Sequence, residues 1–196
     1  MSFFKKLFNL PSEKEENETP KEDLNLSLDD LFVHNFVEKG GKFLYCLKKG
    51  EVVENLENIL RENNWKQLTL SDNDMLGFVD QKTVAITPNI KSNLPIFIKC
   101  EHLIADKGDI LFSSNQLKST KLSEMPQNFI VFATTSQLVA DMGQGLTGIK
   151  IHHKGNLPTN ISAVKNYDIN NNNDDNFLNY GNSNSKNLYL LLLEDL

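Results

Sequence analysis

The chain has 196 residues and a mass of 22.3 kDa, which is the size of one globular domain. Its net charge of −6 and its pI near 5.2 argue against a nucleic-acid-binding surface, which would be basic. Two cysteines are fewer than the roughly four thiolates that an iron–sulfur cluster takes, and they make a poor disulfide framework. No apolar run reaches the ~18 to 20 residues that span a bilayer. We therefore expect a soluble, cytoplasmic protein.

Residues 1–23 are expected to form a short helix and a mobile linker outside the globular domain. Lysines interrupt the apolar stretch at the N-terminus, which is too short for a signal peptide, so we expect no export. Its large apolar residues would share one helix face; they are Phe3, Phe4, Leu7 and Phe8. A helix lying on the domain is favoured over an anchor for a partner or membrane. Residues 11–22 are charged and read as the linker.

The remainder, residues 24–196, is expected to form a single domain in which helices and strands alternate. The helices are predicted at 24–38, capped by Ser27, at 51–64 and at 135–146. The strands are predicted at 43–47, 83–87, 109–113, 128–133 and 188–193, and 95–99 fits a strand or a helix. The last strand is apolar on both faces, as in the centre of a parallel sheet. This alternation predicts an α/β fold with helices on both faces.

An Asn-rich segment, residues 166–186, interrupts this pattern before the last strand. Asn, Asp, Ser and Gly side chains favour turns over regular structure, so we expect a long surface loop. A functional loop over a site is the less favoured alternative.

The usual motifs for metals and phosphates are weak in this sequence. Cys100 and His102 lie two residues apart and could hold a metal or activate a nucleophile, but a packed thiol is the favoured interpretation. His152 and His153 are expected in a surface turn. Glycines at 143, 145 and 148 have dinucleotide-loop spacing, but they fall where the predicted helix ends and are interpreted as caps. We therefore expect no metal site.

The carboxylates near Gly108 are the best candidates for a functional site. Glu101, Asp106 and Asp109 surround this glycine in a polar stretch between apolar runs, which predicts acids gathered in one turn at the edge of a strand. Open α/β sheets bind ligands at strand ends. A solvated hairpin is an equally good interpretation.

The same stretch resembles a known family. Ala105-Asp-Lys-Gly-Asp-Ile-Leu-Phe-Ser-Ser114 is similar to the A-E-T-G-T-hydrophobic segment of the LUD domain, found in lactate utilization protein C. The segments 122–132 and 137–139 resemble the family's L-S-x-x-P-x-x-H-I-x-V-V and Q-I-V elements. Asn179-Tyr-Gly181 and the strand at 188–194 resemble its closing motifs. The match extends from about residue 40 to residue 196.

This resemblance implies a three-layer α/β sandwich like that of the NagB, RpiA and CoA-transferase superfamily. It also implies membership of a system that oxidises L-lactate, in which partner subunits carry iron–sulfur clusters, with no cofactor assigned to this chain. The departures are Lys107 and Asp109 in place of the family's threonines and Phe129 in place of its histidine. The Asn-rich segment also replaces a family motif. A divergent, accessory subunit is therefore expected.

Two other classes of function stay open from the residues. The chain could act alone on a CoA ester or a phosphorylated metabolite, with Glu101 or Asp106 as acid, base or nucleophile. It could instead be a regulatory or scaffolding protein that docks through Phe3 to Phe8.

Overall fold

The computed structural model describes residues 26–168 and 185–195. The predicted N-terminal helix and linker, and most of the Asn-rich segment, lie outside these residues. The first half contains α2 (Leu28–Glu38), β1 (Lys42–Cys46), α3 (Lys49–Glu62), β2 (Gln67–Leu70), η1 (Asn73–Phe78), β3 (Ala85–Thr87) and β4 (Ile96–Lys99). The second half contains β5 (His102–Ile104), β6 (Asp109–Ser113), α4 (Ser114–Leu117), η2 (Leu122–Glu124), β7 (Asn128–Thr134), η3 (Thr135–Gln137), β8 (Leu138–Val139), α5 (Met142–His152), β9 (Ile161–Val164) and β10 (Asn187–Leu193).

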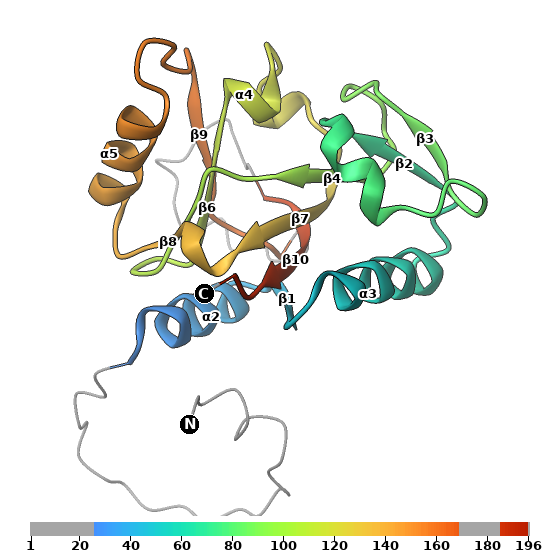
Figure 1. Ribbon diagram of the computed structural model, residues 1–196, viewed down its shortest axis with the longest axis horizontal. Helices are drawn as coiled ribbons and strands as arrows, with labels where there is room; N and C mark the ends of the chain where they lie inside the picture. The colour runs from blue at the N-terminus through green and yellow to red at the C-terminus, as the bar shows by residue number, and fades with distance from the viewer. Residues whose placement is uncertain (1–25, 169–184, 196) are drawn as a thin grey trace, which may run out of the picture.

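The main sheet has six parallel strands in the order β1-β10-β7-β4-β2-β3 (Figure 1). The α/β class and the mostly parallel sheet predicted from the sequence are thereby confirmed. β10 is an inner strand, as its apolar run predicted, and Leu190 pairs with Phe43 of β1 and Val131 of β7. Leu190 and Leu191 point into different apolar clusters, so both faces of this strand are covered.

One face of the main sheet is covered by α3 and η1. Val52, Leu56 and Ile59 place the apolar side of α3 against Leu191, and Met75 of η1 completes the layer. The apolar residues of α3 recur at helical spacing, which is why the sequence predicted this helix correctly. Figure 1 shows α3 below the strands, at the lower right of the view.

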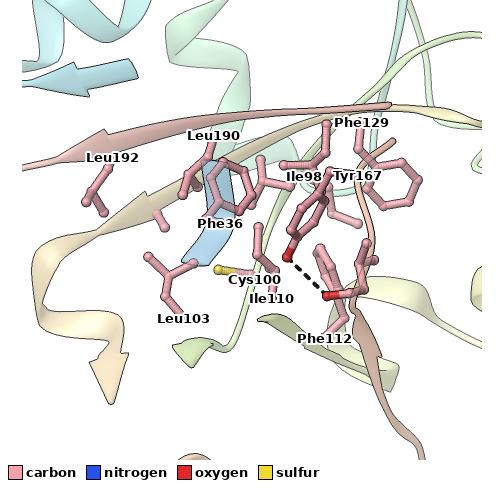
Figure 2. Close-up of a cluster of buried hydrophobic side chains, with 14 of the residues drawn as sticks. Phe36, Ile98, Cys100, Leu103, Ile110, Phe112, Phe129, Tyr167, Leu190 and Leu192 are labelled. Atoms are coloured by element: carbon pink, nitrogen blue, oxygen red, sulfur yellow. Dashed lines mark hydrogen bonds between the residues drawn. The ribbon is translucent and has the colours of Figure 1, made fainter. Parts of the chain in front are cut away.

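The opposite face carries α2 and a second sheet, which the sequence analysis did not predict. This small sheet has the order β8-β5-β6-β9. Phe36 of α2 packs on Tyr167 with ring centroids 4.5 Å apart, and Phe112 of β6 packs on Phe129 of β7 at 5.9 Å (Figure 2). Ser27 caps α2 as predicted, because its side chain accepts a hydrogen bond from the backbone N–H of Asp30.

The helix predicted at 135–146 is wrong in its position. Residues 135–139 form η3 and β8, and α5 begins at Met142, capped by the Asp141 side chain. Its glycines therefore lie within the helix and are not caps at its end. A Cβ at Gly145 would lie 3.0 Å from the Ile104 side chain, and one at Gly148 would lie 2.7 Å from His102 Nε2. These glycines let α5 approach the small sheet closely, beside β8 at the left of Figure 1.

Within residues 26–168 and 185–195, no helix combines the length and the apolarity needed to cross a bilayer.

Candidate functional site

The predicted site residues lie at two ends of one antiparallel hairpin. β5 pairs with β6 so that His102 faces Leu111 and Ile104 faces Asp109. Asp106 and Gly108 lie in the connecting turn, and Glu101 lies at the other end of β5. The prediction that these residues share one turn therefore holds for Asp106 and Gly108, with Asp109 directly after the turn as the first residue of β6, but it is wrong for Glu101.

The turn of the hairpin contacts α2 and Lys39, the residue that follows this helix. Asp109 is 1 % exposed, and its Oδ1 lies 2.9 Å from the Nζ of Lys39. The same ammonium donates to the Lys107 carbonyl, and Asn35 Nδ2 donates to the Ala105 carbonyl over 2.8 Å. These bonds attach the turn to α2.

Gly108 is required for this attachment. Its φ of +62° is a left-handed conformation that favours glycine, and a Cβ there would lie 2.4 Å from the backbone N of Phe36. Its carbonyl also accepts a hydrogen bond from the Tyr167 hydroxyl over 2.6 Å. Asp106, in contrast, is exposed. A ligand-binding role for Asp106, Gly108 and Asp109 stays a prediction.

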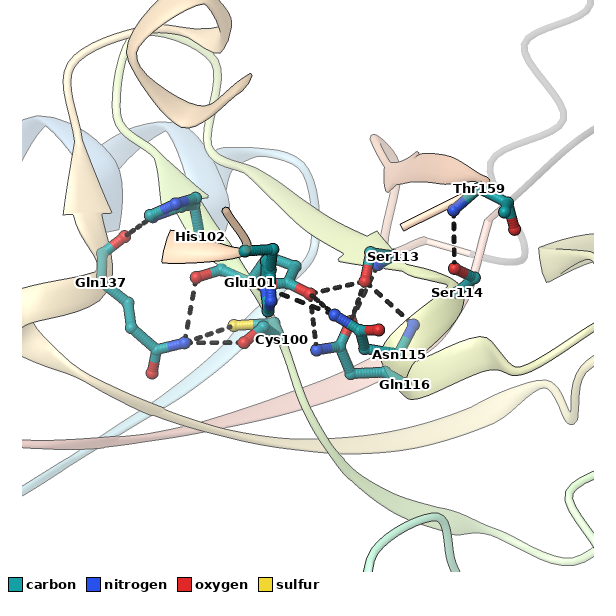
Figure 3. A network of polar contacts seen from close by, with 10 residues as sticks. Cys100, Glu101, His102, Ser113, Ser114, Asn115, Gln116, Gln137 and Thr159 are labelled. Atoms are coloured by element: carbon teal, nitrogen blue, oxygen red, sulfur yellow. Dashed lines mark hydrogen bonds and ion pairs between the residues drawn. The ribbon is translucent and has the colours of Figure 1, made fainter. Parts of the chain in front are cut away.

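The other end of the hairpin holds a polar network centred on Glu101 (Figure 3). Glu101 Oε1 accepts hydrogen bonds from Ser113 Oγ over 2.5 Å and from Gln116 Nε2 over 2.9 Å. Its Oε2 lies 3.3 Å from His153 Nε2, and the Glu101 side chain is only 10 % exposed. Asn115 Nδ2 lies 3.3 Å from the same histidine nitrogen. We call these five residues the Glu101 cluster.

Helix caps place three members of the cluster. Ser113 caps α4, and its Oγ accepts from the backbone N–H of Asn115 over 3.0 Å. Gln116 Oε1 accepts from the backbone N–H of Ser113 over 2.8 Å, which directs its amide nitrogen toward Glu101. His153 comes from the C-terminal cap of α5. The backbone of Glu101 is fixed by Gln137, whose Nε2 donates to the Glu101 carbonyl over 3.1 Å.

This environment determines the charge of Glu101. Burial acts to raise the pKa of the Glu101 carboxyl, but the hydrogen bonds from Ser113, Gln116 and His153, with the charge of His153, outweigh it and hold the pKa below its ordinary value. Glu101 is therefore ionised at neutral pH. Ser113 has no exposed surface, so its hydroxyl is a hydrogen-bond donor rather than an accessible nucleophile.

His153 is the cluster member best suited to proton transfer. Its side chain is 23 % exposed, so its imidazole reaches the surface while Glu101 stays behind it. A protonated Nε2 donates to Glu101, whereas an unprotonated Nε2 accepts from Asn115 Nδ2. The imidazole of His153 thus lies between a carboxylate and an amide and can serve one as a donor or the other as an acceptor.

Cys100 and His102 do not form the paired site that their spacing allows. The Cys100 thiol is buried, and burial, with the nearby charge of Glu101, raises its pKa well above the usual range. His102 Nδ1 instead contacts the Gln137 carbonyl at 3.2 Å. Across the part of the chain that the structure describes, no three His, Cys, Asp or Glu side chains are placed to hold a metal ion.

Sequence reasoning missed four of the five members of the cluster. The spacing of Ser113 and Gln116 is that of a capping box, and this signal could have marked the start of α4. His153 approaches from a position 52 residues away along the chain, and no local pattern indicates that contact.

Comparison with known proteins gives a similarity of fold. No family model matches the chain, and no curated protein matches it. A crystal structure of a DUF162 family protein from Deinococcus radiodurans is similar, with a TM-score of 0.59 and 11 % sequence identity. The similarity covers 87 % of this chain and 99 % of that one. DUF162 corresponds to the LUD domain, so the sequence resemblance and the shared fold agree.

Proposed function

We propose that this protein is a divergent LUD-domain protein of the cytoplasm and an accessory subunit of a system that oxidises L-lactate or another 2-hydroxy acid. The observation that supports this most is the likeness of fold to a DUF162 family protein over 99 % of that chain. A second support is the order, along the chain, of the segments that resemble the LUD family, from Ala105 through the strand that ends at Leu193.

The iron–sulfur chemistry of such a system would reside on partner subunits. The chain has two cysteines, Cys46 and Cys100, and both are buried. A cluster takes about four thiolates. In this proposal the protein therefore contributes binding and positioning rather than electron transfer.

The turn at 105–109 supports an accessory role. Where the family pattern has neutral threonines, this chain has Lys107 and Asp109. The Asp109 carboxylate is buried against Lys39, and the Lys107 carbonyl accepts from the same ammonium. The polar groups of this turn are thus used to hold the hairpin on α2.

The test is recovery of the full chain with its partners. The chain carries an affinity tag, is purified from its native cells under anaerobic conditions, and the eluate is assayed for iron, labile sulfide and L-lactate-dependent dye reduction. We expect an iron–sulfur polypeptide in roughly stoichiometric amount and reduction of the dye. An iron-free, solitary protein would contradict the proposal and limit the resemblance to fold.

The Glu101–His153 contact favours a second candidate, a stand-alone enzyme for a CoA ester or a phosphorylated metabolite. Glu101 and Asp106 make a matched pair for this test, because both are acids of the same hairpin but only Glu101 contacts a histidine. In this case Glu101→Gln would abolish the activity of the purified single chain, and Asp106→Asn would retain it. Equal activity of the two variants would rule out proton transfer at Glu101.

A further inference from the structure

A groove of about 360 Å³ lies between the edge strand β1 and helix α3. Lys42 and Leu44 of β1 form one side, Asn58, Ile59 and Glu62 of α3 form the other, and Tyr189 of β10 also lines it. This volume is at the small end of the range for ligand sites, so it suits a metabolite rather than a cofactor. The Glu101 cluster contributes no residue to this groove.

The Lys42 ammonium is held in place by neutral groups. Its Nζ donates to Asn187 Oδ1 over 2.6 Å and to the Tyr189 hydroxyl over 3.3 Å, and it lies 4.3 Å from the centre of the Tyr189 ring. Asn63 Nδ2 donates to the same hydroxyl over 3.1 Å and so fixes the ring. An ammonium has three N–H donors, and these contacts use two of them. The remaining donor is available to an anion.

The helix side of the groove carries the opposite charge. Within the described residues, Glu62 forms no ion pair, and neither does Lys42. Asn58 of α3 also lines the groove, and its Oδ1 accepts from Arg61 Nη2 over 2.6 Å. Leu44 and Ile59 supply an apolar wall. An exposed cation and an exposed carboxylate, neither of them in an ion pair among the described residues, therefore border one small groove.

We propose that this groove binds an α-amino acid with an aliphatic side chain. The ligand carboxylate accepts from Lys42 Nζ, the ligand ammonium donates to the Glu62 carboxylate, and the side chain packs on Leu44 and Ile59. A zwitterion is the ligand class that satisfies both charges at once. This site is independent of the function proposed above, because it shares no residue with the 105–109 turn or with the Glu101 cluster.

Four probes with the same isobutyl group separate the two charges. They are L-leucine, 4-methylpentanoate, which lacks the ammonium, 3-methylbutylamine, which lacks the carboxylate, and L-2-hydroxy-4-methylpentanoate, which carries a hydroxyl instead. Each is titrated into the full chain and followed by amide NMR. We expect L-leucine to shift residues 42–44 and 55–62 and to bind at least about ten-fold more tightly than the other three.

Matched variants identify the two charged contacts. Lys42→Met and Glu62→Gln are each expected to weaken L-leucine binding about ten-fold or more, the loss that accompanies one charge-assisted hydrogen bond. Lys49→Met and Glu57→Gln are the controls, because they remove the same charges from α3 without lining the groove. Glu62→Gln should leave the affinity for 4-methylpentanoate unchanged.

Three results would overturn this site. The first is no shift in residues 42–44 and 55–62 with L-leucine at about 10 mM, a concentration that reveals even millimolar binding. The second is equal binding of L-leucine and its 2-hydroxy analogue, which would remove the ammonium contact. The third is an affinity that Lys42→Met does not change. None of these results bears on the anaerobic purification, so the two proposals stand or fall separately.

Discussion

Replacing Gly108 by alanine is expected to detach the β5–β6 turn from α2. The φ of +62° at this position costs a non-glycine residue about 1–2 kcal/mol. The new Cβ would lie 2.4 Å from the backbone N of Phe36, and backbone cannot rotate away as a flexible side chain can. The turn must therefore shift, which breaks the Asn35–Ala105 hydrogen bond at about 1 kcal/mol.

These two contributions sum to about 2–3 kcal/mol of lost unfolding free energy, before any loss at the Lys39–Asp109 ion pair. For a chain of this size, that lowers Tm by roughly 4–12 °C. Differential scanning calorimetry measures the shift. The control is Gly50→Ala, at an open position in α3 where alanine is expected to raise Tm slightly. A Gly108→Ala variant that melts within about 2 °C of the wild type would refute the packing role argued for this residue.

Other predictions follow from buried or hydrogen-bonded titratable groups. Burial lowers the pKa of Lys186 to about 8, below its unfolded value of 10.5, so the free energy of unfolding should rise with pH between these two pKa values. In urea unfolding, the wild type should gain about 2 kcal/mol relative to Lys186→Met between about pH 7.5 and 9.5. Parallel pH profiles of the two proteins would contradict this. Desolvation acts to raise the pKa of Asp195, but hydrogen bonds from Ser136 and Thr135 outweigh it and lower the pKa to about 2. The stabilisation by this carboxylate is present above the unfolded pKa and is lost as pH falls through about 2. Asp195→Asn should therefore lower Tm at pH 7 and have the same Tm as the wild type near pH 2. A difference in Tm that persists near pH 2 would exclude the carboxylate as the source of the stabilisation. Burial raises the pKa of the Cys46 and Cys100 thiols, so DTNB should label them only on unfolding, and rapid labelling of the native protein would show that they are accessible.

The parallel sheet could be predicted because its inner strands carry a strong local signal. β7 and β10 are continuous apolar runs, and an inner strand of a parallel sheet is buried on both faces. The small sheet gave no comparable signal, since β5 has three residues and β8 has two. The helix at 135–146 was misplaced because Leu138 and Val139 match a helical pattern as well as the strand that they form.

The candidate site shows a different limit. Glu101 and Asp106 are neighbours along the chain, but the strand between them separates Glu101 from the start of the turn by about 13 Å. Because Glu101 and Asp106 are close in sequence, the sequence predicted one acidic turn, but the two ends of the hairpin contact different elements. The turn end meets α2, and the Glu101 end meets α4 and His153. Such long-range contacts depend on the packing of the whole domain, which no local pattern contains.

The contacts of the turn with α2 and Lys39 explain a departure of this chain from the LUD pattern. A threonine at position 109 would offer a neutral hydroxyl to the Lys39 ammonium, whereas Asp109 offers a buried carboxylate. A buried carboxylate is tolerated only when it is paired, so Asp109 and Lys39 must be retained together. The Asp109 carboxylate and the Lys107 carbonyl therefore serve to attach the turn to Lys39, the residue that follows α2. The likeness to the DUF162 structure extends to the fold, whereas the polar contacts of Glu101, at the opposite end of β5, are made with α4 and His153.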